Sequence, residues 1–230
     1  MKSPLEDTIW GASYGSVAAV QEAFDRIAPD YHATIMASVV PSGAAKAIMP
    51  HLTPDSRGID FGCGSGALGL ALRDAGLRAP LDGVDLSPVM LEFARRTGCY
   101  GELQRANLLL PGECPALARP YDFAVTVGLL GDYVPYYLGL PHIVACVRPG
   151  GFIGYAVESR STSCYALENL ARELGLAPLS NMALPVPEGM LTEQVYQFYA
   201  RKNFIIPPGV CTRTTARPTS GRCSPRLYAR

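Results

Sequence analysis

Short apolar runs alternate with segments of helical periodicity through the middle of this 230-residue chain. The apolar runs are short enough for strands, and the segments between them, at about 10–15 residues, suit helices. We expect strands at 57–61, 81–85, 102–105, 121–127 and 152–157. We expect helices at 66–76, 88–98 and 134–147. Strands that alternate with helices predict an α/β fold whose doubly wound parallel sheet is buried on both faces.

The N-terminal part lacks strand-like runs. Residues 16–28 have helical spacing, and Pro29 is expected to end that helix. The apolar segment 32–49 predicts one or two further helices before the first strand. Residues 1–50 are therefore expected to form an N-terminal helical cap.

The C-terminal part changes pattern after a helix expected at 165–175. Two strand-like runs, 181–186 and 194–202, predict a hairpin at the sheet edge. The expected whole is a Rossmann-like, seven-stranded, mostly parallel sheet with an antiparallel edge strand, in a domain over 51–203. Residues 204–230 are rich in Pro, Thr, Ser and Arg without periodicity and predict a disordered basic tail.

Composition excludes several classes of protein. The chain is 48% hydrophobic and 17% charged, which excludes disorder over most of its length. Lys+Arg and Asp+Glu number 20 each, so no global charge favours a nucleic-acid partner. Without an apolar run of about 18 residues no membrane span is expected, and Glu6 and Asp7 stand where a signal peptide would be apolar, so a cytoplasmic protein is predicted. Seven cysteines without CxxC spacing indicate reduced thiols and no metal site.

A glycine-rich turn is the most informative segment. Residues 59–66 read IDFGCGSG, between a predicted strand and a predicted helix. Glycines at alternate positions allow positive φ and a close approach of backbone to a ligand, and the helix N-terminus offers free N–H groups. Gly64, Gly66 and Gly69 also fit the dinucleotide pattern, so a nicotinamide- or flavin-dependent oxidoreductase is one alternative.

Two acidic residues favour a different nucleotide. Asp60 precedes the glycines at the end of the strand, where a carboxylate would repel a pyrophosphate but can hold an ammonium group. Asp85 closes the next strand, where a carboxylate can accept both ribose hydroxyls. S-adenosylmethionine carries both groups, and no further domain remains for a dehydrogenase substrate. The alternative for each residue is structural: Asp60 as a partner of the helix N-terminus and Asp85 as an N-cap.

Residues 57–157 resemble class I S-adenosylmethionine-dependent methyltransferases. The resemblance rests on five segments in order: GIDFGCGSG (58–66), GVDLSPVMLEFAR (83–95), ANL (106–108), YDFAVTVGLLGDY (121–133) and VRPGGFI (147–153). Residues 24–35 and 193–203 extend it to about 14–203, similar to small ubiquinone/menaquinone-type and Williams–Beuren-region methyltransferase-like proteins.

The resemblance implies a set of cofactor-binding residues. Asp60, Gly62, Gly64 and Gly66 would line the methionine end, with Cys63 in the same turn as an apolar packing residue. Asp85 would bind the ribose and Leu86 would lie against the adenine. Asn107 stands where the family commonly has Asp, beside Leu108, and its amide oxygen can still accept from the adenine amino group. Val127 and Gly128 would bring backbone near the sulfonium, and Tyr14 and Tyr31 would approach the cofactor or form a lid.

The acceptor side is expected just past the fourth strand, at 128–137. Tyr133, Tyr136 and Tyr137 could stack a planar acceptor or pack under a lid. Methyl transfer from a sulfonium needs a general base only when the acceptor carries a proton, and the candidates are His32 in the cap and Asp132. The alternatives are a cap histidine without a catalytic role and a solvated loop acid. His51 and His142 are expected to be structural.

The predicted function is methyl transfer from S-adenosylmethionine to a small-molecule acceptor, with specialised metabolism as one setting, yielding S-adenosylhomocysteine. The alternative is a protein that binds the cofactor without methylating, as a cyclase or lyase or as a regulatory module. No nucleic acid or membrane partner is expected, and monomer and homodimer stay open.

Overall fold

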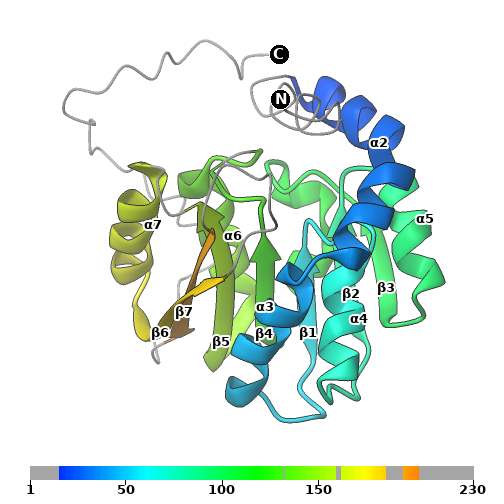
Figure 1. The fold of residues 1–230 in the computed structure, drawn as a ribbon. Coiled ribbons are helices and arrows are strands. Elements are labelled where there is room, and N and C mark those ends of the chain that lie inside the picture. The colour runs from blue at the N-terminus through cyan, green and yellow to red at the C-terminus, as the bar shows by residue number, and fades with distance from the viewer. Residues whose placement is uncertain (1–15, 132, 159–161, 185–193, 202–230) are drawn as a thin grey trace.

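A seven-stranded sheet organises the protein (Figure 1). The computed structural model describes residues 16–131, 133–158, 162–184 and 194–201. The strands are β1 Gly58–Phe61, β2 Leu81–Asp85, β3 Tyr100–Arg105, β4 Tyr121–Val127, β5 Val147–Glu158, β6 Leu176–Leu184 and β7 Gln194–Arg201. Their order in the sheet is β3-β2-β1-β4-β5-β7-β6. Strands β1 to β5 pair in parallel, and β7 runs antiparallel to β5 and β6.

Helices cover both faces of the sheet. They are α2 Val17–Ala37, α3 Val40–Ile48, α4 Ala67–Asp74, α5 Pro88–Arg96, α6 Tyr136–Cys146 and α7 Thr162–Glu173, with short 3-10 turns at Met49–His51, Pro111–Glu113 and Pro115–Ala118. Helices α3 and α4 pack with β4 and β5 on one face, and α6 and α7 pack on the other. The expected α/β Rossmann-like architecture is confirmed.

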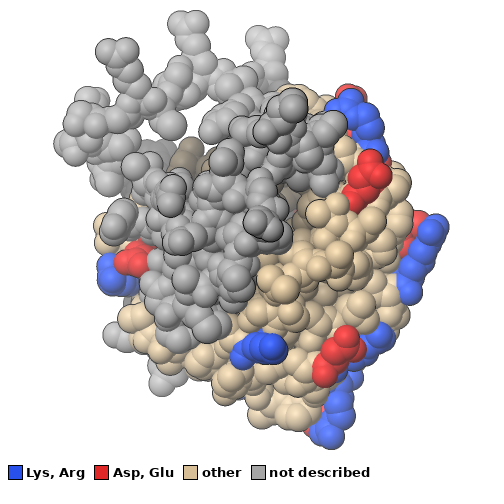
Figure 2. Space-filling model, viewed as in Figure 1, with Lys and Arg blue, Asp and Glu red and all other residues tan. Residues whose placement is uncertain are grey.

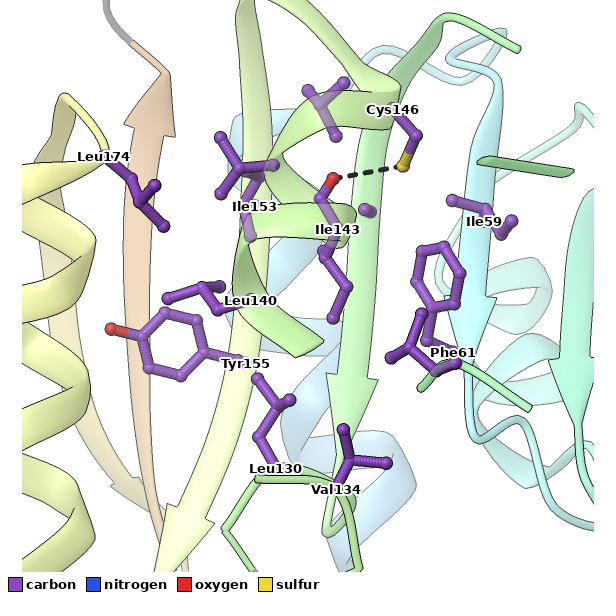
Figure 3. Close-up of a cluster of buried hydrophobic side chains, with 14 of the residues drawn as sticks. Ile59, Phe61, Leu130, Val134, Leu140, Ile143, Cys146, Ile153, Tyr155 and Leu174 are labelled. Carbon is purple, nitrogen blue, oxygen red and sulfur yellow. Dashed lines mark hydrogen bonds between the residues drawn. The ribbon is translucent and has the colours of Figure 1, made fainter. Parts of the chain in front are cut away.

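The alternation of side chains along each strand builds two separate hydrophobic cores. On β4, Phe123 and Val125 point toward α3 and α4, whereas Ala124 points toward α6. The larger core lies around α6, where Leu140 lies next to Tyr155 of β5 (Figure 3). A strand buried on both faces explains why 121–127 is apolar almost throughout.

The structure extends several expected strands. β2 and β4 have the predicted bounds, while β3 begins at Tyr100 and β5 begins at Val147. Residues Pro149–Gly151 precede the strand expected at 152–157, but they lie within β5. There the register jumps from Tyr121↔Val147 to Phe123↔Phe152. The extra residues form an irregularity that tolerates the positive φ of Gly150, +75°.

Pro29 does not end the first helix, which corrects the sequence expectation. Helix α2 continues through Pro29 to Ala37. A proline inside a helix removes the hydrogen bond to the carbonyl four residues earlier and costs about 3 kcal/mol. Burial of Ala23, Ile27 and Ala28, on the turns before Pro29, anchors α2 on the body of the protein. These tertiary contacts outweigh the local cost.

The hairpin at the sheet edge is present, with its antiparallel strand placed one position inward. β7, the strand that runs against the others, lies between β5 and β6, and β6 is outermost. β6 begins at Leu176, earlier than expected. The expected turn of the hairpin and the predicted tail both lie outside the described residues.

Among the helices that the structure describes, none combines the length and the apolar character needed to cross a bilayer.

Candidate cofactor site

The carboxyl ends of four parallel strands bring the predicted residues to one edge of the sheet. The glycine turn follows β1, Asp85 ends β2, Asn107 follows β3 and Gly128 follows β4. Helix α2 runs beside this edge, next to α5 (Figure 1). The site is therefore a product of sheet topology, because parallel strands necessarily place their carboxyl ends together.

The glycine turn has the backbone that its sequence predicted. Gly62, Gly64 and Gly66 have φ values of +71°, +51° and +88°, in the region that side chains disfavour. Gly62 and Cys63 donate backbone hydrogen bonds to the carbonyl of Val84, at 2.8 and 3.1 Å. The turn is thereby fixed to the end of β2.

A cavity opens between this turn, α2 and α3. The space between these elements is about 430 Å³ when the part that is open to solvent is counted. Its polar lining includes Asp60 and Ser65, and its apolar lining comes from α2, α3, α4 and Val127. Ser65 is 1% exposed, and its hydroxyl has no hydrogen-bond partner among the described residues. An orphaned hydroxyl in a cavity wall indicates a site that a polar ligand completes.

Asp60 is buried at the base of this cavity. It is 2% exposed, and its Oδ2 accepts a hydrogen bond of 2.9 Å from the Tyr100 hydroxyl. Burial raises the pKa of Asp60 to about 7; the Tyr100 hydrogen bond acts in the opposite direction, and the Asp85 charge raises it further. Asp60 is therefore a carboxyl group that a cationic ligand would favour in its ionised form.

Asp85 connects the glycine turn to α5. Its Oδ2 accepts from the Gly64 N–H at 2.8 Å and its Oδ1 accepts from the Ser87 N–H at 2.9 Å. Burial raises the pKa of Asp85, the backbone hydrogen bonds lower it, and the charge of Asp25 raises it. Each carboxylate oxygen keeps a further lone pair, so both can still accept from a ligand.

Helix α2 closes over the turn. A side-chain carbon at Gly64 would lie 3.7 Å from the ring of Tyr31, which together with Ile35 lines the cavity. Burial, with the charges of Asp85 and Asp60, raises the pKa of Tyr31 to about 12, so its hydroxyl is neutral and can donate. The Ser87 hydroxyl donates to Asp25 Oδ1 at 2.5 Å, which ties α2 to the start of α5.

The three tyrosines that were expected on the acceptor side have different surroundings in the structure. The Tyr133 ring meets Phe24 of α2 edge-on, with ring centroids 5.2 Å apart. Tyr136 packs against the larger core, and Tyr137 is 53% exposed. Tyr133 therefore contacts α2.

Of the two candidates for a general base, the structure describes only His32. The His32 ring packs on Phe93 of α5 with centroids 4.7 Å apart, and its buried Nδ1 has no hydrogen-bond partner among the described residues. The structure does not place His32 in the cavity wall, because Tyr31 and Ile35 occupy the face of α2 that lines it. Asp132 lies outside the described residues, as does Tyr14.

The remaining residues predicted to bind the cofactor lie in different parts of the structure. Cys63 is buried against Leu91 and Ala94, and burial raises its thiol pKa well above the usual value, in keeping with packing and not with a nucleophile. The Leu108 side chain is 5% exposed in the larger core. The others lie at the sheet edge. Val127 lines the cavity, Gly128 has φ +68°, Leu86 is half-buried and Asn107 Oδ1 accepts from the Leu109 N–H at 3.0 Å.

Sequence reasoning missed three functional candidates. Tyr100 of β3 donates a hydrogen bond to Asp60. The hydrogen bond between Ser87 and Asp25 connects the start of α5, next to the site, with α2. Ser87 had a local signal as an N-cap, which the structure bears out through its bond from the Met90 N–H at 3.0 Å. Tyr100 and Asp25 had none, because each reaches a partner far along the chain.

Comparison with known proteins agrees with this fold. Residues 59–151 match the family described as a methyltransferase domain. This match, together with the arrangement of strands, glycine turn and paired carboxylates, supports a class I S-adenosylmethionine-dependent methyltransferase.

Several proteins that are named as methyltransferases or methyltransferase-like are similar to the chain. Human methyltransferase-like protein 27 is 26% identical over 87% of this chain and 83% of its own length. The ubiquinone biosynthesis O-methyltransferase of Xanthomonas campestris pv. campestris is 31% identical over 52% of this chain, which matches half of that protein. The magnesium protoporphyrin IX methyltransferase of Synechocystis, solved with bound S-adenosylmethionine, shares the fold with a TM-score of 0.58, at 16% identity over 87% of this chain and 93% of that one.

The described residues fit S-adenosylmethionine. Asp60 is a buried carboxylate for an ammonium group, and Ser65, whose hydroxyl has no partner among the described residues, lines the same cavity. The positive φ of Gly64 disfavours a side chain at this position, so the backbone of the turn stays open to a ligand.

Proposed function

We propose that this protein transfers the methyl group of S-adenosylmethionine to a small-molecule acceptor beneath the α2 cap. The observation that carries the proposal is the cavity between the glycine turn and α2, whose lining combines the polar residues Asp60 and Ser65 with apolar residues of α2 and α3 and with Val127. An apolar lining with a few polar groups is typical of small-molecule sites.

In this proposal, residues of the chain bind and orient the cofactor. Asp60 pairs with the ammonium of the cofactor, and Asp85 accepts from the ribose hydroxyls while it holds Gly64 in place. The cofactor supplies an activated methyl group on a sulfonium. Tyr31 covers the turn and helps exclude water, so that proximity and orientation supply much of the rate.

Surface charge supports a small acceptor over a nucleic acid. On the face shown in Figure 2, acidic and basic side chains gather along the flank and lower edge in neighbouring groups of opposite sign. Glu92 pairs with Arg95 and Arg96 on α5, and Arg78 pairs with Asp55. Residues 1–203 contain 15 basic and 20 acidic residues. A phosphate backbone favours a continuous basic surface, which these pairs do not provide.

The test is product analysis with labelled cofactor. The purified protein is incubated with methyl-labelled S-adenosylmethionine and a metabolite extract, and mass spectrometry follows S-adenosylhomocysteine and labelled products. We expect both to form. A protein that binds S-adenosylhomocysteine but generates none in any extract would be a cofactor-binding, non-methylating protein.

The cofactor assignment has a matched pair of variants. Asp85→Ala should weaken S-adenosylhomocysteine binding by roughly 1.5–3 kcal/mol, because it removes hydrogen bonds to a charged group. Asp82→Ala is the control, since Asp82 lies in the same strand and bonds the Tyr121 hydroxyl at 3.0 Å. Equal affinity of the two variants in calorimetry would overturn the ribose assignment.

A further inference from the structure

We propose that Tyr100 is a positioning residue for cofactor binding: its hydroxyl holds the Asp60 carboxylate in the orientation that receives the ammonium of the cofactor. The proposal rests on the proposed function, because Asp60 is the ammonium partner there. Tyr100 is not among the residues that line the cavity, so it acts through Asp60 and not by touching the ligand.

The hydrogen-bond geometry fixes the direction of the Tyr100 hydroxyl. The oxygen accepts from the backbone N–H of Gly69, in the first turn of α4, at 3.2 Å. The single hydroxyl proton is then donated to Asp60 Oδ2 at 2.9 Å. A hydroxyl with both roles occupied cannot rotate away without losing a buried hydrogen bond, so Asp60 has one defined partner.

Three glycines make the space that the Tyr100 ring occupies. A side-chain carbon at Gly69 would lie 2.6 Å from ring atoms, one at Gly83 would lie 2.9 Å away and one at Gly66 would lie 3.1 Å away. These glycines come from a helix, a strand and the turn. Glycine inside a helix costs about 1 kcal/mol relative to alanine. Gly69, which fitted a dinucleotide pattern, therefore has a different role here: it admits Tyr100.

The groups around Asp60 give it no positive charge within the described chain. Tyr31 faces it from α2, Cys63 from the turn, Asp85 from the end of β2 and Tyr100 from β3. The charged residues of α3 and α4, which are Lys46, Arg73 and Asp74, are exposed. Of these neighbours, Tyr100 donates the side-chain hydrogen bond that stabilises the ionised carboxylate.

This role predicts a specific pH dependence. The cofactor ammonium needs ionised Asp60, so binding strengthens as pH rises through the pKa of Asp60. Loss of the Tyr100 hydrogen bond raises that pKa, which moves the transition to higher pH. A variant that lacks only the hydroxyl should therefore be most impaired near neutral pH and least impaired in alkali.

The test is calorimetry with S-adenosylhomocysteine between pH 6 and 9, on the wild type and Tyr100→Phe. The ratio of their Kd values at each pH cancels the titration of the ligand's own amino group. We expect about tenfold weaker binding of the variant at pH 7, with the ratio falling as pH rises. Tyr121→Phe is the control, because it removes a similar hydrogen bond between a tyrosine and an aspartate, near the amino ends of the strands and away from the site. The ratio of the Kd of this variant to that of the wild type should stay near one.

The outcomes are distinguishable. A wild type that does not bind S-adenosylhomocysteine overturns the proposed function. Binding by the wild type, together with a Tyr100→Phe ratio that is near one or independent of pH, overturns the role of Tyr100. Asp60→Asn supplies a second measurement, because Tyr100→Phe should cause little further loss of affinity in that background. An additive loss would show that Tyr100 acts independently of Asp60.

Discussion

At the scale of single residues, burial of the Asp60 carboxylate lowers the free energy of unfolding at neutral and alkaline pH. A buried carboxyl with its pKa raised from 3.8 to about 7 holds a proton in the folded state that the unfolded state releases. Between these values the folded protein binds more protons, so the free energy of unfolding falls as pH rises. The cost is greatest above pH 7, where the folded state must bury an ionised group.

Asp60→Asn should therefore stabilise the ligand-free protein at pH 8, by on the order of 2–4 kcal/mol, while it weakens cofactor binding. At pH 4 the two proteins should differ little, because Asp60 is then protonated. Denaturant unfolding at both pH values, taken as the difference between variant and wild type, measures the effect. An equal difference at both pH values would contradict the raised pKa.

Asp132 and His32 can be separated by turnover. We expect Asp132→Asn to lower the rate by 10²–10⁴-fold for an acceptor that must lose a proton, with Kd for S-adenosylhomocysteine unchanged. His32→Ala should leave turnover close to wild type, because its ring packs on Phe93 outside the cavity wall. Rate measurements with an identified acceptor decide between them, and full activity of Asp132→Asn would mean that transfer needs no base from this loop.

At the scale of elements, α2 is fixed to the body through the start of α5. Ser87 accepts from the Met90 N–H as N-cap of α5 and donates to Asp25 of α2. The same residue donates its backbone N–H to Asp85. One serine therefore links the cap, α5 and the proposed ribose carboxylate, and the position of α2 depends on a side chain outside it.

Ser87→Ala should lower the free energy of unfolding by about 1–2 kcal/mol and weaken S-adenosylhomocysteine binding several-fold. Ser16→Ala is the matched control, because Ser16 caps α2 at an exposed position and accepts from the Ala19 N–H at 3.3 Å. The control should cost less stability and leave affinity unchanged. Thermal unfolding and calorimetry of both variants test this, and identical affinities would mean that the Asp25 link does not affect the site.

At the scale of the whole molecule, the two cores and the seven strands are built within residues 16–201. Truncation after Asn203 should therefore keep the Tm within a few degrees and preserve S-adenosylhomocysteine binding. Scanning calorimetry of the truncated and full chains checks the prediction. A large fall in Tm would show that residues beyond Asn203 contribute to the fold, as Phe204, Ile205 and Ile206 could by their apolar character.

The sequence by itself determined whatever depends on neighbours along the chain. Strand and helix periodicity predicted the architecture, and the position of Asp60 and Asp85 at strand ends predicted that both would lie at one edge, because parallel strands share that edge. The positive φ of Gly62, Gly64 and Gly66 followed from glycine spacing.

Only the tertiary structure decided the contacts between distant residues. Tyr100 reaches Asp60 across 40 positions and Ser87 reaches Asp25 across 62, and no local pattern encodes where such side chains meet. Packing also overrode a local signal, since α2 continues past Pro29 and directs Tyr31 toward the cavity but His32 toward α5. Burial then set the pKa of Asp60, because desolvation depends on what the whole chain places around a carboxylate.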